Sequence, residues 1–234
     1  MKNLKILVML LLMQSSRVCS QQTRKKLEGW EIKYGLLIQN IPLDDSDGGK
    51  LLEGFIKDMM LAEREKGYFT CYVTDQQMRT EEKSSADRVT LSRKGDAFYY
   101  ILNHGKKEAS RKFRDASYVE EEMEDNIAIV ISAGDYKVSF SDEEKCILGF
   151  SCRKAIFINP KIPGVEIVVW YTDKIPSHYR GREAYLRQLP GSALEIYSQE
   201  NGMRIGMMAI RVKKIKIDED IFSIPSDYRI INEQ

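Results

Sequence analysis

The sequence has few histidines, few cysteines and no glycine-rich phosphate loop. Its two histidines, His104 and His178, form no H-E-x-x-H motif and do not cluster with the four cysteines, so the spacing predicts no metal site. Without a phosphate-binding loop, we expect no cofactor. Beyond the first residues, no apolar stretch approaches the roughly 20 residues of a membrane-spanning helix. These absences argue against a metalloenzyme, a nucleotide-dependent enzyme and a transmembrane protein.

Charge of neither sign is in excess. The chain has 36 Lys and Arg residues against 35 Asp and Glu residues, for a formal net charge of +1. Loss of residues 1–20 would remove Lys2, Lys5 and Arg17 and no acidic residue, which changes the net charge to −2. A balance so close to neutral argues against a nucleic-acid partner and against a polybasic membrane-binding role.

Residues 1–20 have the pattern of a secretory signal. Lys2 and Lys5 precede an apolar run over 6–13, and the following polar segment allows a cut after Ser20. The apolar run is too short to cross a bilayer. We therefore expect an exported protein, located in the periplasm or at the cell surface of a bacterium.

Cys19 leaves a second kind of export open, namely a lipoprotein with an acylated cysteine. Arg17 and Val18 do not fit the small residues that a lipobox prefers, which favours a cut without a lipid anchor. In either case residues 21–234 show no internal repeat and no low-complexity linker, and their length suits a single β-rich domain.

Alternation of apolar and polar residues dominates the mature chain and predicts strands. The run 165–171 is apolar on both faces, so we expect it to be a central strand that is covered on both sides. Gly149 is typical of a hairpin turn. A shift in the alternation at Lys213-Lys214 predicts a β-bulge, or a bend where the sheet curls. The charged segment 103–126 is expected to be a solvated loop or short helix. Strands are predicted at 31–39, 69–74, 78–82, 88–92, 97–102, 127–132, 136–140, 150–158, 165–171, 193–197 and 203–217.

One helix is predicted between the acidic turn 44–49 and Gly67, because apolar residues recur there at intervals of three and four. Two interpretations stay open. The helix can be a core element packed in the concave face of a sheet, or a lid over a lipid cavity, since methionine adapts to varied apolar surfaces. For the second interpretation, the candidate ligand-binding residues are Leu52, Phe55, Ile56, Met59 and Trp170.

The basic loop Ser177–Gln188 is the candidate partner-binding segment. Arginine and tyrosine are frequent at protein interfaces, and they suit an anionic partner such as a lipid headgroup or an acidic protein surface. The alternative is an ordinary solvated loop. The candidate residues are His178, Tyr179, Arg180, Arg182, Tyr185 and Arg187.

Hydrolytic catalysis near this loop would require a catalytic triad of Asp173, His178 and Ser192. No G-x-S-x-G motif surrounds Ser192, and spacing alone does not establish a triad. We therefore predict no catalytic residues and a protein that is not an enzyme. A hydrolase remains the third hypothesis, after the two binding functions described below.

The mature chain retains Cys71, Cys146 and Cys152. An oxidising compartment permits one disulfide, and the spacing leaves all three pairings open. The alternative is a set of three buried thiols that pack as small hydrophobic groups.

Three segments carry a family resemblance: ILGFSCRKA (Ile147–Ala155), WYTDKIP (Trp170–Pro176) and LPGSALEI (Leu189–Ile196). The last two resemble the signature pair of the GLPGLI family, and the first is similar to a segment of that family and of a related uncharacterised secreted bacterial family. Gln188 stands in place of the first glycine of the family motif. The resemblance implies secretion and the curved antiparallel sheet of periplasmic lipoprotein carriers. It implies no catalytic residues, because the family has none that are agreed.

The sequence therefore predicts a mainly β (α+β) fold, in which a strongly curved antiparallel sheet or half-barrel embraces one or two helices. The first functional hypothesis is a non-enzymatic envelope protein that carries a lipid or lipidated peptide between the sheet and a helix. The alternative is an envelope protein–protein interaction module with a solid core and no ligand.

Overall fold

The computed structural model of the protein describes residues 25–40, 54–58, 67–82, 88–114, 118–122, 127–177, 179, 181–200 and 202–232, with the side chains of 118–130 and 181–182 left out. The predicted export signal at 1–20, including Cys19, lies outside the described residues. In the ranges that are described, no helix combines the length and the apolar character needed to cross a membrane.

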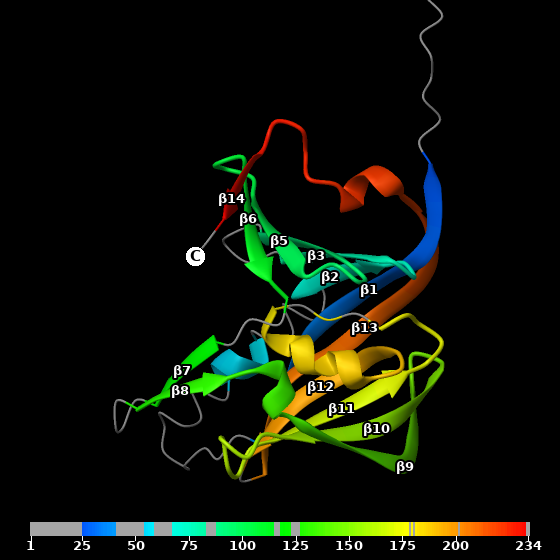
Figure 1. Ribbon diagram of the computed structural model, residues 1–234. Helices are drawn as coiled ribbons and strands as arrows, with labels where there is room; N and C mark the ends of the chain where they lie inside the picture. The colour runs from blue at the N-terminus through cyan, green and yellow to red at the C-terminus, as the bar shows by residue number, and fades with distance from the viewer. Residues whose placement is uncertain are drawn as a thin grey trace, which may run out of the picture.

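Strands dominate the architecture, and twelve of them form one open sheet in the order β14-β6-β5-β4-β3-β2-β1-β13-β12-β11-β10-β9 (Figure 1). Neighbours run antiparallel except β14 and β6, which are parallel. The strands are β1 (Lys26–Gln39), β2 (Phe69–Val73), β3 (Gln77–Glu82), β4 (Arg88–Arg93), β5 (Phe98–Asn103), β6 (Glu108–Phe113), β9 (Lys137–Ile147), β10 (Phe150–Ile158), β11 (Glu166–Thr172), β12 (Ser192–Glu200), β13 (Met203–Asp218) and β14 (Arg229–Asn232). The mainly β prediction is confirmed, and the sheet does not close into a barrel.

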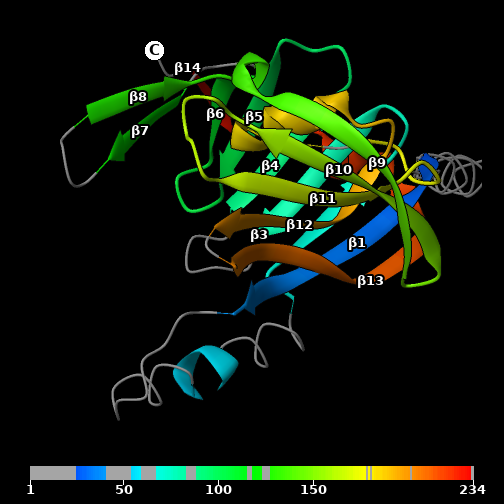
Figure 2. The same cartoon turned by 90° about the horizontal axis from the view of Figure 1, so that it is seen from below.

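Short elements complete the described chain. β7 (Tyr118–Glu122) and β8 (Ile127–Ile131) form a separate two-stranded sheet. Three 3₁₀ helices are described, namely η1 (Ala133–Asp135), η2 (Gly181–Gln188) and η3 (Glu219–Phe222). Residues 54–58 form one short helical segment, which lies beyond the end of β1 and away from the sheet (Figure 2).

A long ribbon of β1 and β13 divides the sheet into two half-sheets. The N-terminal part of β1 pairs with β2 from Trp30 to Tyr34, whereas β12 pairs with the first residues of β13, from Met203 to Met208. The ribbon therefore belongs to both halves (Figure 1). We call β2–β6 with β14 the first half-sheet and β9–β12 the second half-sheet.

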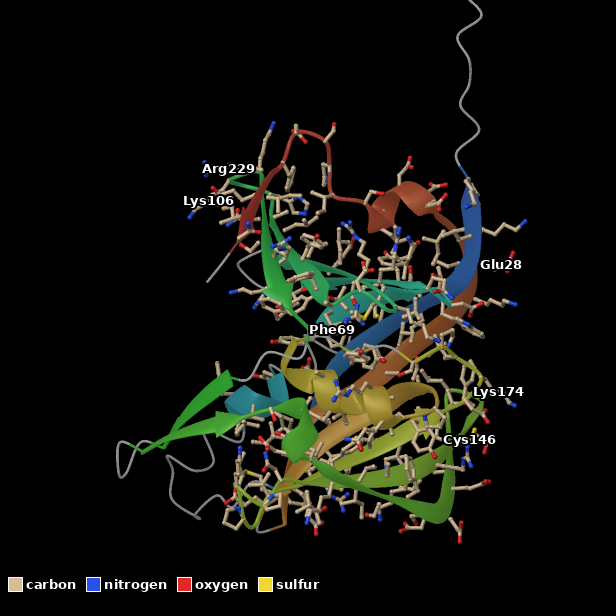
Figure 3. The ribbon with its side chains drawn as sticks, viewed as in Figure 1. Glu28, Phe69, Lys106, Cys146, Lys174 and Arg229 are labelled. Carbon is tan, nitrogen blue, oxygen red and sulfur yellow. The ribbon has the colours of Figure 1, made fainter. Side chains whose placement is uncertain are left out.

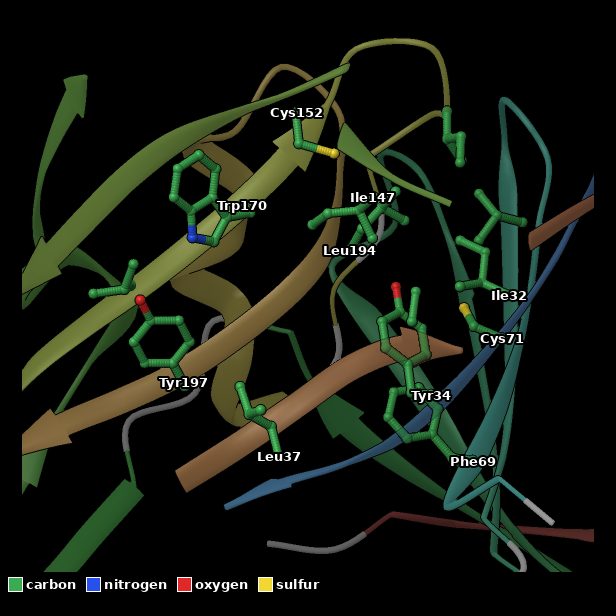
Figure 4. Close-up of a cluster of buried hydrophobic side chains, with 14 of the residues drawn as sticks. Ile32, Tyr34, Leu37, Phe69, Cys71, Ile147, Cys152, Trp170, Leu194 and Tyr197 are labelled. Atoms are coloured by element: carbon green, nitrogen blue, oxygen red, sulfur yellow. The ribbon is translucent and has the colours of Figure 1, made fainter. Parts of the chain in front are cut away.

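The main hydrophobic core holds the two half-sheets together, because its buried residues come from both (Figure 4). Tyr34 of β1 shows this best. Its ring stacks on Phe69 of β2 with 4.6 Å between centroids, and its hydroxyl donates a hydrogen bond of 2.7 Å to the backbone oxygen of Ala193 in β12. Tyr34 thus contacts both half-sheets at once. The other buried members are Ile32, Leu37, Cys71, Val73, Met78, Ile147, Cys152, Val168, Trp170, Ile175, Leu194, Tyr197 and Ala209.

A second core covers the opposite face of β11. Val169 and Tyr171 pack there with Tyr185 and Leu186 of η2, while Val168 and Trp170 belong to the main core. β11 lies between β10 and β12 and is buried on both faces, so the prediction of a covered central strand is confirmed.

The C-terminal segment covers one face of β4, β5 and β6. Ile224 and Tyr228 pack on Val89, Leu91 and other buried residues of this face. The Arg79 side chain donates a 2.8 Å hydrogen bond to the backbone oxygen of Ile221, which joins η3 to β3. The chain end is therefore part of the fold of the first half-sheet.

Two predictions about local structure were wrong. Segment 103–126 contains β6 and β7 rather than a loop or helix. Arg111 of β6 lies over the Phe98 ring at 4.4 Å, so a charged residue covers an apolar neighbour on the next strand. The bulge lies at Ile210, where the β1–β13 register changes between Lys33 and Tyr34, and not at Lys213-Lys214.

Cys71, Cys146 and Cys152 are thiols in the described structure, so none of the possible disulfide pairings forms. Leu148 and Gly149 make the hairpin turn with φ of 50° and 87°. This two-residue turn pairs Cys146 with Ser151, so Cys146 and Cys152 point to opposite faces. Cys152 is buried as predicted for a small hydrophobic thiol, and burial raises its pKa to about 11. Cys71 is likewise buried, whereas Cys146 is exposed.

Candidate binding cleft

A cleft of about 770 Å³ lies where segments from both half-sheets approach each other. One side consists of the inner face of β1–β4 with the β2–β3 and β4–β5 turns. The other side is formed by Ser177, Tyr179, Arg187 and residues of two chain corners, which we define as Asp173–Pro176 after β11 and Leu189–Gly191 before β12. Both corners belong to segments that carry the family resemblance. Its volume falls in the range of ligand-binding pockets in proteins. This is the candidate functional site.

The floor is a transverse row of residues that are paired across neighbouring strands. Lys214 of β13 pairs with Trp30 of β1, and Trp30 pairs with Val73 of β2. The row continues through Met78 of β3 to Ser92 of β4. Residues that are directly opposite in a sheet share a face, and all five line the cleft. The register of the sheet therefore builds the floor.

The facing wall depends on a tight contact between the two corners. Ser192 donates its backbone N–H to the Ile175 oxygen at 3.0 Å and its hydroxyl to the Pro176 oxygen at 2.5 Å. A Cβ atom added to Gly191 would lie 2.0 Å from the Thr172 oxygen and 2.7 Å from the Asp173 Cα. Only glycine permits this approach, which places Pro176 and Pro190 on the same wall.

Hydrogen bonds hold the turns of the first half-sheet. The Thr74 hydroxyl oxygen accepts the backbone N–H of Gln77 at 2.9 Å and closes the β2–β3 turn. Lys94 in the next turn donates its backbone N–H to the Gln76 oxygen at 2.8 Å. The two turns therefore form one rim, and their side chains project from a fixed backbone.

Arg114 connects this rim to the facing wall. Its guanidinium donates to the Ser92 hydroxyl at 2.6 Å, to the Arg93 backbone oxygen and to the Tyr179 hydroxyl at 3.3 Å. The Tyr179 ring lies 5.4 Å from the guanidinium carbon. A planar, permanently charged side chain can make these contacts together, and Arg114 thus positions Tyr179 at the end of the cleft.

Basic residues outnumber acidic residues along the cleft. Two of the acidic residues have weak ion pairs, because Lys174 lies 3.5 Å from Asp173 and Lys214 lies 4.0 Å from Glu28. All four side chains are more than half exposed, and such surface pairs contribute little. The charged lining residues are Lys94, Arg114, Lys174, Arg187 and Lys214 against Glu28, Asp75 and Asp173.

The structure separates the residues of the predicted partner-binding loop. Tyr179 and Arg187 line the cleft. Tyr185 is 6% exposed and packs against Tyr136 and Phe157 at 4.5 Å and 5.1 Å between ring centroids, so it is a core residue. His178 and Arg180 lie outside the described residues, and only the backbone of Arg182 is described.

The predicted ligand-binding residues do not surround a cavity in the part of the chain that is described. Phe55 is 65% exposed and Ile56 is partly buried, so the helical segment is not a core helix at Phe55. Trp170 is 8% exposed in the main core, with the Lys145 amine 4.4 Å above its ring. Leu52 and Met59 lie outside the described residues.

An apolar space between the half-sheets is small. It lies beside Tyr34, Phe69, Ile196 and Met207 and measures about 20 Å³. A cavity of this size holds about one water molecule. An acyl chain does not fit in this space as the half-sheets stand.

Two of the three residues considered for catalysis make structural contacts. Ser192 is fully buried, and its hydroxyl is engaged with the Pro176 oxygen. Asp173 is exposed and lies 3.8 Å from Arg153, while His178 lies outside the described residues. Among the residues that the structure describes, no group of three or more His, Cys, Asp or Glu side chains could hold a metal ion.

No protein-family model and no curated protein matches the chain. Two structures of PNGF-II, in space groups C2 and P21, are similar to it with TM-scores of 0.38 and identities of 17% and 18%. Each match covers 88% of this chain, which spans only 31% and 32% of those chains. An uncharacterized conserved protein from Thermus thermophilus matches with a TM-score of 0.42 and 7% identity, over 88% of this chain and 90% of that chain. Likenesses this distant carry no argument about function.

Proposed function

We propose that the protein is a non-enzymatic interaction module of the cell envelope, which holds part of a partner protein in the cleft between its half-sheets. The main observation behind the proposal is that the surface cleft is much larger than the apolar space between the half-sheets. The cleft offers about 770 Å³, whereas the apolar space between the half-sheets offers about 20 Å³. A partner can therefore bind at the surface without a rearrangement of the core.

The chemistry of the cleft supports this proposal. Tryptophan, tyrosine and arginine contribute most of the binding energy at many interfaces, and Trp30, Tyr179 and Arg187 line this cleft. The rim is built from turns held by backbone hydrogen bonds, so binding would cost little ordering of the backbone.

The envelope location and the family resemblance remain proposals from the sequence. We also propose that the sheet is of the lipoprotein-carrier type, which its open, curved antiparallel form supports. The corners that carry the resemblance form one wall of the cleft, from Asp173 to Pro176 and at Leu189 and Pro190. A shared binding surface would account for that resemblance.

Carriage of an apolar ligand is the second candidate function. It is favoured by Phe55, whose ring is 65% exposed on the helical segment. A lipid or lipidated peptide could cover this ring. Such a ligand would also have to separate the half-sheets, because the apolar space beside Tyr34 and Phe69 is too small for it.

Site-specific photocrosslinking tests the proposed function. A photoreactive phenylalanine analogue replaces Gln76, which is an exposed cleft residue, and in the control it replaces the exposed Lys106. Lys106 lies far from the cleft residue Glu28 (Figure 3). After irradiation of expressing cells, we expect adducts with other proteins from position 76 and several-fold fewer from position 106. Equal adducts from both positions, or none from position 76, would overturn the proposal.

A further inference from the structure

The length of the cleft floor fits an extended polypeptide. The floor crosses five neighbouring strands, from β13 through β1, β2 and β3 to β4. Strands lie about 4.8 Å apart, so this row is roughly 19 Å long. An extended chain advances about 3.3 Å per residue, so about six residues would span the floor.

Positive charge is placed at both ends of this row. Lys214 stands on β13 at one end. At the other end, Lys94 lies in the β4–β5 turn, two residues after Ser92 of β4. Arg114 donates a hydrogen bond to the Ser92 hydroxyl. Both lysines line the cleft. Two carboxylates about six residues apart on an extended chain could therefore each meet a basic side chain.

These lysines are available to a partner. Among the described residues, Lys94 makes no ion pair. Within the same described part of the chain, Lys214 pairs with Glu28 alone, at 4.0 Å, and these two side chains are 62% and 64% exposed. An exposed pair at this distance is worth little. A partner carboxylate could therefore displace Glu28 at small cost.

The middle of the cleft is less polar than its ends. Trp30 is partly exposed on the floor, and Pro176 and Pro190 line the opposite wall. Val73 and Met78 lie on the floor but are only 1% and 5% exposed, so the partly exposed Trp30 is the apolar floor residue that a partner can reach. An apolar side chain near the centre of a bound segment would pack against this ring.

The geometry points to an extended acidic polypeptide segment of another protein as the occupant of the cleft. The segment carries two carboxylates about six residues apart, and an apolar side chain between them contacts Trp30. This inference rests on the proposed function and adds the chemical class of the partner. Charge complementarity selects the partner, and the length of the floor selects the spacing.

Tryptophan fluorescence provides the test. The chain has two tryptophans: Trp30 lines the cleft, and Trp170 is buried in the main core. A Trp170→Phe variant makes Trp30 the sole reporter, and circular dichroism checks its fold. The probe is a peptide of about seven residues with a glutamate at each end and valine, leucine and valine at its centre. One control peptide has lysines at the ends, and another has both glutamates adjacent at one end.

We expect saturable quenching of Trp30 by the probe, with an affinity that falls as salt rises. Lys94→Ala and Lys214→Ala should each weaken binding about threefold, as loss of an exposed ion pair would. The matched control Lys106→Ala should leave binding unchanged. The adjacent-glutamate peptide should bind more weakly than the probe, and the lysine-ended peptide should not quench.

Equal binding of the two glutamate peptides would overturn the inference, because it would indicate a single anion site such as one for a lipid headgroup or small anion. Absence of quenching by the probe would overturn it too. If crosslinking from position 76 persists in that case, the interaction module stands and only the acidic class of partner falls. If both the quenching and the crosslinking are absent, both proposals fall.

Discussion

Replacement of Gly191 with alanine should lower the free energy of unfolding by about 3 kcal/mol or more, or prevent folding altogether. The new Cβ would lie 2.0 Å from the Thr172 oxygen and 2.7 Å from the Asp173 Cα. Both are backbone atoms, so no side-chain rotation relieves the overlap. The corners would have to separate, and the cleft wall that they form would move with them. Urea unfolding followed by circular dichroism measures the loss.

Gly105→Ala is the matched control. The atom nearest to its added Cβ is the Asn103 Oδ1 at 3.6 Å, an ordinary contact, so we expect stability within about 1 kcal/mol of the original protein. If Gly191→Ala were as stable as Gly105→Ala, the tight contact between the corners would be contradicted.

Tyr34→Ala should cost about 3–5 kcal/mol of stability, as the loss of a buried aromatic ring does. Tyr34 is 1% exposed and packs between the half-sheets, with its ring on Phe69. Tyr34→Phe keeps the ring and removes the hydroxyl that donates to the Ala193 oxygen. Its expected cost is about 1–2 kcal/mol, because a buried acceptor loses its partner.

Chemical denaturation of the two variants separates ring packing from the hydrogen bond. Phe113→Ala serves as the comparison, since this aromatic side chain is 62% exposed and should cost less than about 1 kcal/mol. A Tyr34→Ala variant no less stable than Phe113→Ala would show that the half-sheets do not depend on this contact.

Local pattern was sufficient for much of the fold. The apolar residues on both faces of 165–171 predicted a covered central strand, and β11 has that place. Gly149 predicted the hairpin turn that the chain makes there. The prediction of a loop or short helix over 103–126 failed because charged residues replace apolar ones in the alternating pattern of β6. Arg111 in β6, for example, covers an aromatic ring on the neighbouring strand β5.

The candidate cleft was only partly predictable. The corners at Asp173–Pro176 and Leu189–Gly191 were recognised from sequence, and one wall is made of them. The floor was missed because it depends on pairing between residues as distant as Trp30 and Lys214, and no local pattern encodes that register. Tyr185 was misassigned because a tyrosine in a basic loop can pack into a core as easily as it can face a partner.

The chain's mode of binding is tested most directly by a native mass spectrum of the protein, expressed as residues 1–234 and purified without denaturation. Binding at a surface cleft predicts a species with the mass of the polypeptide alone once weak partners are washed away, because the space between the half-sheets is about 20 Å³. A retained apolar molecule that is lost from a folded Phe55→Asp variant would contradict this account and establish the carrier instead.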